Sequence, residues 1–253
     1  ERSVHPRNVN GYRRTRQPIW TNLDYPIAMS FKAERQRLSA FFQFGQSVDC
    51  VVFGYDGSEL QILVIERGAE PFFGYEALPG DLVRMDEDID EAATRILHDL
   101  TGLNNVFLDQ LKTFGSVQRH PLGRVVTTAF YSLINQTKYN PRPASWAVKA
   151  RWKSLGELHE MAFDHREILQ TALDALQRQV RQHPIGFELL PEEFTLAQLQ
   201  GLYEAVLNTQ FDKANFRKKI LSMEVLKALD KTQKAVRHRP ARLYKFDPQR
   251  YHS

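Results

Sequence analysis

The stretch GDLVRMDEDIDEAATRILHDLTGL, residues 80–103, decides the fold of the first half of the chain. It is typical of a loop that leads into an amphipathic helix. Apolar side chains recur at helical spacing on one face, namely Ile89, Ala92, Ala93, Ile96, Leu97 and Leu100. Gly102 stands where such a helix is expected to end. The pattern predicts a helix with one face in a core.

Leu78-Pro79-Gly80, followed by Glu87, Arg95 and Gly102, resembles a Nudix box. Aligned on the glutamate and the arginine, the match is broken at the positions that carry the chemistry. The motif glycine and its three later glutamates are replaced by Asp81, Ile96, Asp99 and Leu100. The scaffold positions of the motif are therefore present, whereas most of the metal ligands are not.

Hydrolysis of a pyrophosphate requires a divalent cation that neutralises the substrate and activates water. Such a cation prefers several oxygen ligands, usually more than one carboxylate. The helical turn offers Asp99 alone, with Glu87 and Glu91 as the nearest further carboxylates. We predict that the chain holds no catalytic metal, has no catalytic residues and is not an enzyme, and that Asp99 is a solvated helix residue.

The residues around the box predict an α/β fold. Apolar strands are expected over residues 48–55 and 60–67, joined by a turn at Asp56-Gly57, and over residues 125–134 and 147–152. A second helix is expected after Phe163, with Asp164 as its N-cap. His165 is expected to be a structural hydrogen-bond partner, and a catalytic base is the alternative. This order matches a Nudix-like α/β/α sandwich, and the resemblance covers residues 45 to about 182.

The amino-acid composition by itself indicates little about the function of the chain. The chain of 253 residues carries a net charge of +4, and its single cysteine, Cys50, is expected to be a buried thiol. No apolar run is long enough to span a bilayer and no signal peptide is apparent, so a cytoplasmic location is expected. Residues 1–40 are expected to form a basic, partly disordered extension. Within it, residues 1–28 precede a plausible start at Met29, and a nucleic-acid-binding arm is the alternative.

The last sixty residues change character. Thr195 precedes an apolar helical stripe over residues 196–207, and Asp212 precedes a second helix, residues 213–223, which we expect to continue to residue 229. Residues 241–246 alternate like a strand. A helix, a turn, a basic helix and a basic hairpin predict a winged helix-turn-helix.

The charge of this region favours nucleic acid as its partner. Residues 212–246 contain eleven basic and three acidic residues, and the excess is larger than the net charge of the whole chain. A solvated basic face is the alternative. The expected DNA-binding residues are Lys213, Asn215, Arg217, Lys218, Lys219, Arg237, Arg239 and Arg242. Asn215 has the geometry to contact adenine, and Arg217 to contact guanine.

Taken together, the two halves resemble the Nudix-related transcriptional regulators of the NrtR family. The expected domains are an effector-binding domain over residues 41–183, a linker over 184–190 and a DNA-binding domain over 191–253. The resemblance implies a homodimeric repressor of NAD biosynthesis or salvage genes that binds a palindromic operator. It also implies release from the operator by ADP-ribose or a related nucleotide, with no cofactor required. A sugar-sensing regulator of the same build and an active pyrophosphatase are the alternatives.

A diphosphate bound without a metal needs cationic or amide donors. We therefore expect the effector at six residues, namely Arg67, Phe73, Asp81, Arg84, Arg119 and Phe130. The arginines would contact phosphates, the aromatic rings would stack on a base, and Asp81 would accept a hydrogen bond from a ribose hydroxyl. Core packing is the alternative for each aromatic residue.

Overall fold

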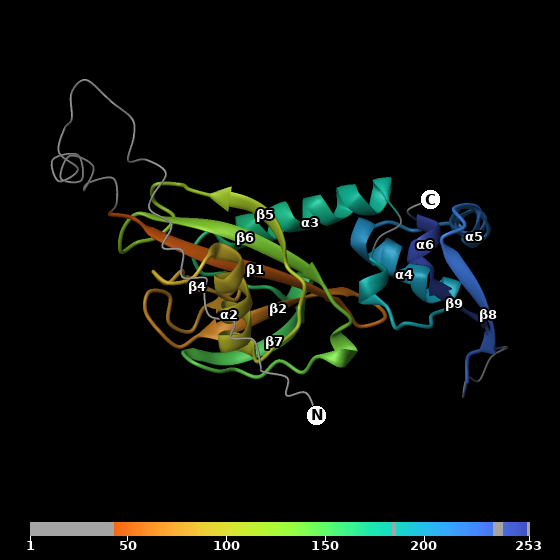
Figure 1. The fold of residues 1–253 in the computed structure, drawn as a ribbon, viewed down its shortest axis with the longest axis horizontal. Helices are drawn as coiled ribbons and strands as arrows, with labels where there is room; N and C mark the ends of the chain where they lie inside the picture. Colours follow the sequence, from red (N-terminus) through yellow and green to blue (C-terminus); the bar gives the residue numbers. More distant parts are fainter. Residues whose placement is uncertain (1–42, 184–185, 235–239, 252–253) are drawn as a thin grey trace, which may run out of the picture. The chain divides into compact units, whose positions relative to one another are not determined.

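The computed structural model describes residues 43–183, 186–234 and 240–251, and residues 44–253 form one compact unit (Figure 1). The predicted extension over residues 1–40 lies outside the described residues. The first domain is built on a mixed seven-stranded sheet. Its strands are β1 (Gly45–Tyr55), β2 (Leu60–Arg67), β3 (Glu76–Ala77), β4 (Gly80–Leu82), β5 (Asp109–Phe114), β6 (Val125–Leu133) and β7 (Ala147–Ser154).

Strand β1 is the centre of this sheet. It pairs antiparallel with β2 and β4 and parallel with β6. Its side chains alternate between two cores: Val51 and Phe53 point to one, whereas Cys50 and Val52 point to the other. The strand is buried on both faces because a helix covers each side of the sheet. The α/β/α sandwich predicted from the sequence is therefore confirmed.

Helix α2 (Ile89–Thr101) covers one face. Asp88 caps it in a capping box with Glu91, and Gly102 ends it with a left-handed φ of 71°. Five of the six predicted stripe residues are buried, but Ile89 is 37% exposed because it lies in the first turn, beyond the edge of the core. Helix α3 (His165–Gln182) packs on the opposite face.

The second domain follows a short buried connection. Phe187 and Leu189 of the 3-10 turn η4 (Phe187–Leu189) are buried in the same apolar cluster as the sheet face under α3. Its elements are α4 (Leu196–Leu207), α5 (Lys213–Ser222), β8 (Leu226–Thr232), β9 (Arg242–Phe246) and α6 (Pro248–Tyr251), grouped together in Figure 1. The first domain contains two further 3-10 turns, η2 (Gln136–Lys138) and η3 (Leu155–Glu157).

One predicted element is wrong. We expected residues 224–229 to continue the preceding helix, but α5 ends at Ser222, and residues 226–232 form β8. Glu224 adopts a left-handed φ of 56°, which ends the helical path. Leu226 then pairs with Phe246 of β9, so a contact distant in sequence overrides the local helical preference.

One expectation from composition is met within the described residues. Cys50 is fully buried and its thiol lies 3.8 Å from the carbonyl oxygen of Ala93. Burial raises the pKa of this thiol, as expected for an inert core cysteine. None of the helices described has the length and apolar character needed to cross a membrane.

Candidate effector pocket and nucleic-acid interface

A cavity of about 340 Å³ opens at the edge of the sheet where β1, β2 and β4 approach the start of α3. Arg67, the last residue of β2, lies inside it. Its guanidinium carbon is 4.7 Å from the ring centre of Trp146 and 4.9 Å from that of Phe163, and its Nε donates to the carbonyl of Pro71. Only Nε has a hydrogen-bond partner among the described residues, which leaves both Nη groups available to a ligand.

A buried ion cluster forms the floor of the cavity. Arg119 donates from Nε and Nη2 to the two carboxylate oxygens of Asp164, at 2.8 and 2.7 Å, and from Nη2 to Asp49 at 3.2 Å. Burial alone would lower the pKa of Arg119, but the two carboxylates raise it. In the absence of an effector, Arg119 therefore neutralises the buried Asp49 and the partly buried Asp164.

His165 completes this cluster. Its Nδ1 accepts from the backbone N–H of Leu78 at 2.9 Å, so Nε2 carries the proton and faces Asp49 Oδ1 at 3.2 Å. Burial alone would raise the pKa of Asp49, but His165 and then Arg119 bring it below its usual value. The predicted structural role of His165 as a hydrogen-bond partner is confirmed.

Two glycines allow the cavity walls to approach so closely. A Cβ at Gly80 would lie 1.9 Å from Asp49 Oδ1, and one at Gly68 would lie 2.4 Å from the carbonyl oxygen of Trp146. Both contacts are far shorter than real Cβ contacts. The glycine of Leu78-Pro79-Gly80 therefore serves here to admit a buried carboxylate rather than to bend the chain.

The box surface, formed by Arg84, Glu87, Arg95 and Asp99, lies outside the cavity, although Asp81 at the start of the box lines it. Arginines pair with both carboxylates of this surface. Arg95 donates two hydrogen bonds to the carboxylate of Glu87, at 2.7 and 2.5 Å, and its Nη1 lies 3.6 Å from Asp99. The side-chain hydrogen bond from Arg95 lowers the pKa of Glu87 to about 2. Asp99 is thus a partly solvated helix residue, as expected, that also forms an ion pair with Arg95.

Two of the three replaced glutamates of the box are core residues in this chain. Ile96 is fully buried and Leu100 is 1% exposed, both in the cluster between α2 and the sheet. Within the described residues, no group of three His, Cys, Asp or Glu side chains is arranged to hold a metal ion. A divalent cation that used Glu87 or Asp99 on this surface would have to displace Arg95 from that carboxylate.

The structure brings three of the six predicted effector residues together. Arg67, Asp81 and Arg119 all line the cavity, and Asp81 Oδ2 accepts from Trp146 Nε1 at 3.2 Å. The other three do not line it. Phe130 is 1% exposed and belongs to the core, so it is not available to stack on a base.

Phe73 and Arg84 are the remaining two. Phe73 is 62% exposed on the loop between β2 and β3, where the preceding Phe72 turns inward instead and packs on Phe163. Arg84 belongs to the box surface, 3.9 Å from Asp99. Phe73 and Arg84 therefore lie outside the cavity that Arg67, Asp81 and Arg119 share, and their contact with an effector stays a prediction.

Among the cavity residues that sequence reasoning missed are Ser47, Asp49, His120 and Trp146. His120 stacks on Phe163 with ring centres 5.1 Å apart, and the hydroxyl of Ser47 is buried with no hydrogen-bond partner among the described residues. Of these four, only Asp49 could have been recognised from the sequence, because it is a charged residue inside an otherwise apolar strand. A buried carboxylate requires a partner, which the structure supplies from residues distant in sequence.

The second domain presents a cationic surface on α5. Asp212 caps this helix by accepting from the backbone N–H of Asn215, while Ile220 anchors its inner face. The five predicted residues of α5 are all exposed, namely Lys213, Asn215, Arg217, Lys218 and Lys219. In the described part of the chain, none of its four cations has an ion pair or a side-chain hydrogen bond. They are free to contact phosphates.

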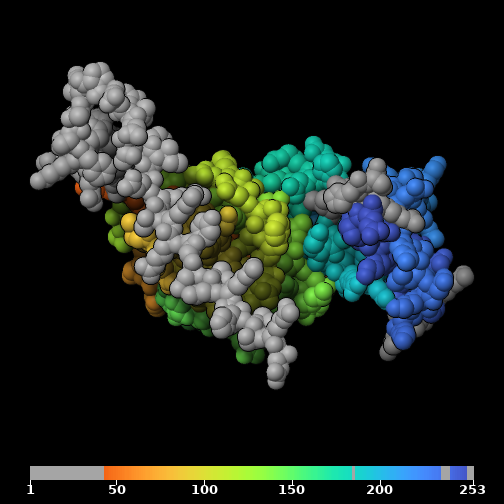
Figure 2. Space-filling model, in the orientation of Figure 1, coloured from red at the N-terminus to blue at the C-terminus, as the bar shows by residue number. Residues whose placement is uncertain are grey.

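The β8–β9 hairpin forms a wing beside α5, and both appear in blue in Figure 2. Arg217 and Arg242 line the same groove of about 650 Å³ between the first turn of α4, α5 and the wing. Arg242 Nη2 is 3.1 Å from Asp230. The other two predicted wing residues, Arg237 and Arg239, lie outside the described residues.

Comparison with known proteins agrees with this division. Residues 43–172 match the NUDIX domain family, and residues 186–246 match the NrtR DNA-binding winged helix domain. The chain is 34% identical over 209 residues to the ADPR responsive transcriptional repressor NtrR of Acinetobacter baylyi, covering 81% of this chain and 83% of that protein. The chain belongs to the NrtR family.

Solved structures support the NrtR assignment over most of the chain. Shewanella oneidensis NrtR, crystallised with a 27mer DNA, is 26% identical with a TM-score of 0.68, covering 82% of this chain and 95% of that one. The NUDIX domain of the same protein, crystallised with ADP ribose, is 26% identical with a TM-score of 0.52, covering 58% of this chain and 99% of that one. The resemblance to the NrtR family and the fold inferred from the sequence are confirmed.

Proposed function

We propose that this NrtR-family protein is an ADP-ribose-responsive transcriptional repressor that binds operator DNA and holds its effector without hydrolysing it. One observation carries the proposal: a DNA-binding domain with four unpaired cations on α5 shares a chain with a Nudix domain whose box carboxylates are already paired with arginines. The named functions of the Acinetobacter and Shewanella relatives support the same assignment.

The cavity offers groups suited to a nucleoside diphosphate sugar. The free Nη groups of Arg67 suit a phosphate, because guanidinium pairs with phosphate oxygens in a bidentate manner. Asp81, with the nearby Glu70, provides acceptors for ribose hydroxyls. The rings of Trp146 and His120 add flat apolar surface for the sugar or the base. ADP-ribose or a related nucleotide meets all three requirements without a metal.

The same geometry supports the proposed absence of turnover. Water activation would need a divalent cation on several carboxylates, but Arg95 holds Glu87, and the positions of Ile96 and Leu100 carry no oxygen ligands. A relative named ADP-ribose pyrophosphatase, from Methanocaldococcus jannaschii, is 32% identical over 110 residues and covers 44% of this chain and 64% of that protein. Loss of box carboxylates is consistent with a sensor derived from such an enzyme.

We further propose that the protein acts in the cytoplasm as a homodimer on a palindromic operator. A two-fold dimer would place two α5 helices in successive major grooves, which calls for an inverted repeat. The regulated genes would be those of NAD biosynthesis or salvage, since ADP-ribose is chemically a fragment of NAD. The proposed domain boundaries remain residues 41–183 and 191–253, with residues 184–190 as the connection.

A mobility shift on the DNA upstream of its own gene, with and without ADP-ribose at fixed moderate salt, tests the function. Binding that ADP-ribose abolishes supports the repressor and its effector together. Binding that ADP-ribose leaves unchanged rejects the effector, and pentoses would be the next ligands to test. Magnesium-dependent release of AMP from ADP-ribose in a parallel assay would reject the inactive Nudix domain.

A further inference from the structure

The start of α3 differs from every other capped α-helix start that the structure describes. Asp88, Thr195 and Asp212 precede α2, α4 and α5 in extended conformations with ψ of 174°, 158° and 127°, and each side chain accepts from the helix backbone. Asp164 precedes α3 with a ψ of 19°, and its side chain makes no capping bond. A good capping residue is therefore present but diverted from capping.

The effector cavity accounts for this diversion. The carboxylate of Asp164 is held by two hydrogen bonds from Arg119, and the next residue, His165, is bonded to Leu78 and faces Asp49. The preceding Phe163 has a left-handed φ of 53°, which is strained for a bulky residue, while its ring packs on Arg67 and His120. Residues 163–165 thus combine a strained backbone at Phe163 with three side chains that are held by contacts in the cavity.

The other half of α3 is attached to the DNA-binding domain. Gln177 Nε2 donates to the carbonyl of Val206 in α4 at 2.9 Å. Leu176 and Val180 lie in the same apolar cluster as Leu199 and Leu202 of α4. The 18 residues of α3 span about 27 Å as a rigid helix. One rigid element therefore joins the effector cavity to the domain that carries α5.

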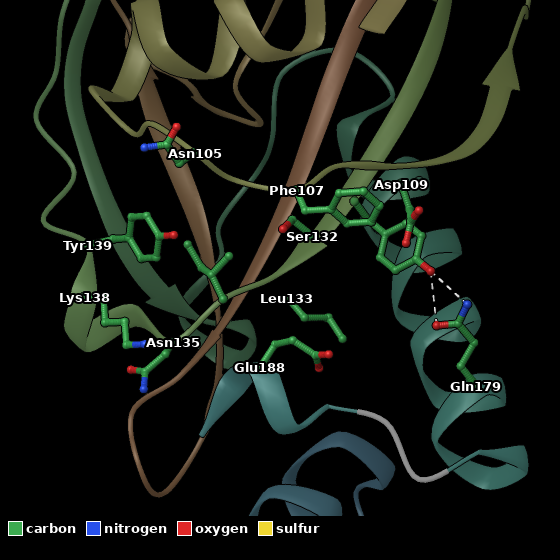
Figure 3. A pocket seen from close by; sticks show the side chains of 12 residues that line it. Asn105, Phe107, Asp109, Ser132, Leu133, Asn135, Lys138, Tyr139, Gln179 and Glu188 are labelled. Carbon is green, nitrogen blue, oxygen red and sulfur yellow. Dashed lines mark hydrogen bonds between the residues drawn. The ribbon is translucent and has the colours of Figure 1, made fainter. Parts of the chain in front are cut away.

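Space for movement lies beside this half of α3. A second cavity, of about 480 Å³, opens between the end of β6, α3 and η4, with Gln179 and Glu188 on its wall (Figure 3). Gln179 contacts β6 through two hydrogen bonds with the Tyr131 hydroxyl, at 2.8 and 3.1 Å. Close-packed interfaces resist displacement, whereas a helix that borders a cavity can shift with a small loss of contacts.

We propose that residues 163–165 are the switch through which effector binding reaches the DNA-binding domain. This inference rests on the proposed function and deepens it. Phosphate oxygens of the effector take over hydrogen bonds of Arg119 and release Asp164. The freed carboxylate then turns to the extended conformation and caps α3, as the other capping residues do. The first turn of α3 moves, and the helix carries α4 and α5 with it.

The energetics of this switch are balanced in a way that suits regulation. In the free state Arg119 is paired and α3 is uncapped; in the bound state the effector pairs with Arg119 and Asp164 caps α3. The Arg119 guanidinium and the Asp164 carboxylate thus have hydrogen-bond partners in both states. A modest preference of the effector for the bound state is therefore enough to shift the population. Because coupling is reciprocal, operator DNA should weaken effector binding by the same factor.

Two variants and one matched control test the switch. Asp164→Ser keeps a capping side chain but removes the ion pair with Arg119, and Gln177→Ala cuts the hydrogen bond from α3 to α4. Asp88→Ser makes the same change as the first variant at an ordinary helix start remote from the cavity. For each full-length protein, ADP-ribose affinity is measured by calorimetry, and DNA affinity is measured with and without saturating ADP-ribose. Thermal melting verifies folding.

In the wild type, ADP-ribose should weaken DNA binding by a factor within about 5–150, the usual range of allosteric coupling. Asp164→Ser should bring this factor to within about twofold of one and weaken DNA binding without effector, because α3 is already capped. Gln177→Ala should lower the factor and leave ADP-ribose affinity unchanged, and Asp88→Ser should alter neither.

If ADP-ribose weakens DNA binding by the wild-type factor in both Asp164→Ser and Gln177→Ala, the switch is overturned, while the proposed function stays intact. Loss of ADP-ribose binding in Asp164→Ser would also overturn it, because Asp164 would then be an effector contact instead of a transmitting residue. Should Asp164→Ser fail to fold, the result with Gln177→Ala decides. No effect of ADP-ribose on DNA binding by the wild type would reject the proposed function itself.

Discussion

The basic side chains of the two domains are held in opposite ways. In the Nudix domain, Arg95 and Arg119 are each locked between two carboxylates. On α5, the four cations have no such partner among the described residues, although Asp212 lies at the start of the same helix. Arg67 is intermediate, since it is buried against two rings but only its Nε is hydrogen-bonded to the chain.

This difference suggests that the pairing of a cation, rather than its identity, indicates its role. In the effector-free protein, a paired and buried arginine neutralises carboxylates of its own chain and contributes to folding. An unpaired exposed cation releases counterions when it meets a phosphate backbone and contributes to DNA affinity. An arginine that is buried but incompletely bonded is suited to a ligand. Four predictions test this assignment, beginning with the largest expected effect.

Arg119→Leu should destabilise the fold by about 3–5 kcal/mol, because Asp49 and Asp164 would be left as buried charges without a cation. Urea denaturation measures the loss. Adding Asp49→Asn and Asp164→Asn to the same chain should restore part of the stability, since the uncompensated charges are removed. A single variant as stable as the wild type would show that the cluster does not support the fold.

Lys218→Glu combined with Lys219→Glu should weaken operator binding at least ~100-fold and reduce the salt dependence of log Kd by about two counterions. The melting temperature and the ADP-ribose affinity should not change, because both side chains are exposed and unpaired. Lys112→Glu, a charge reversal on β5 of the Nudix domain, is the matched control. An equal loss of binding in the control would assign the effect to overall charge.

Arg67→Ala should weaken ADP-ribose binding about 10- to 100-fold, the value of one or two charge-assisted hydrogen bonds to phosphate. Arg84→Ala should have no effect, because that side chain lies on the box surface beside Asp99 and does not line the cavity. Isothermal titration of both variants measures the contrast. Equal weakening would place the effector across the box instead of in the cavity.

The smallest effect concerns acid stability. Pairing lowers the pKa of Glu87 from 4.5 to about 2, so the stability it provides is complete above pH 4.5 and is lost as the pH falls towards 2. Arg95→Gln should therefore flatten the decline of the melting temperature between pH 4.5 and 2, compared with the wild type. A decline of unchanged slope in this variant would mean that the box ion pair contributes nothing to folding.

Local patterns in the sequence were sufficient for most of the architecture. The spacing of apolar residues predicted α2, α3 and α4, and alternation predicted β9, because burial on one face of a helix or strand imposes its period on the sequence. Capping residues such as Thr195 and Asp212 act through bonds within their own turn, so they too could be recognised. The basic excess after residue 212 depends on composition alone.

Only the tertiary structure determined how the site is assembled. Asp49, His120 and Trp146 meet in one cavity from three distant segments, and no local pattern connects them. The capping position of Asp164 was correctly predicted, but Arg119 removes its side chain from the helix. Likewise, β8 forms a strand because β9 is available to pair with it. Sequence fixes what lies within one turn or one strand, whereas side-chain partners across the fold depend on packing.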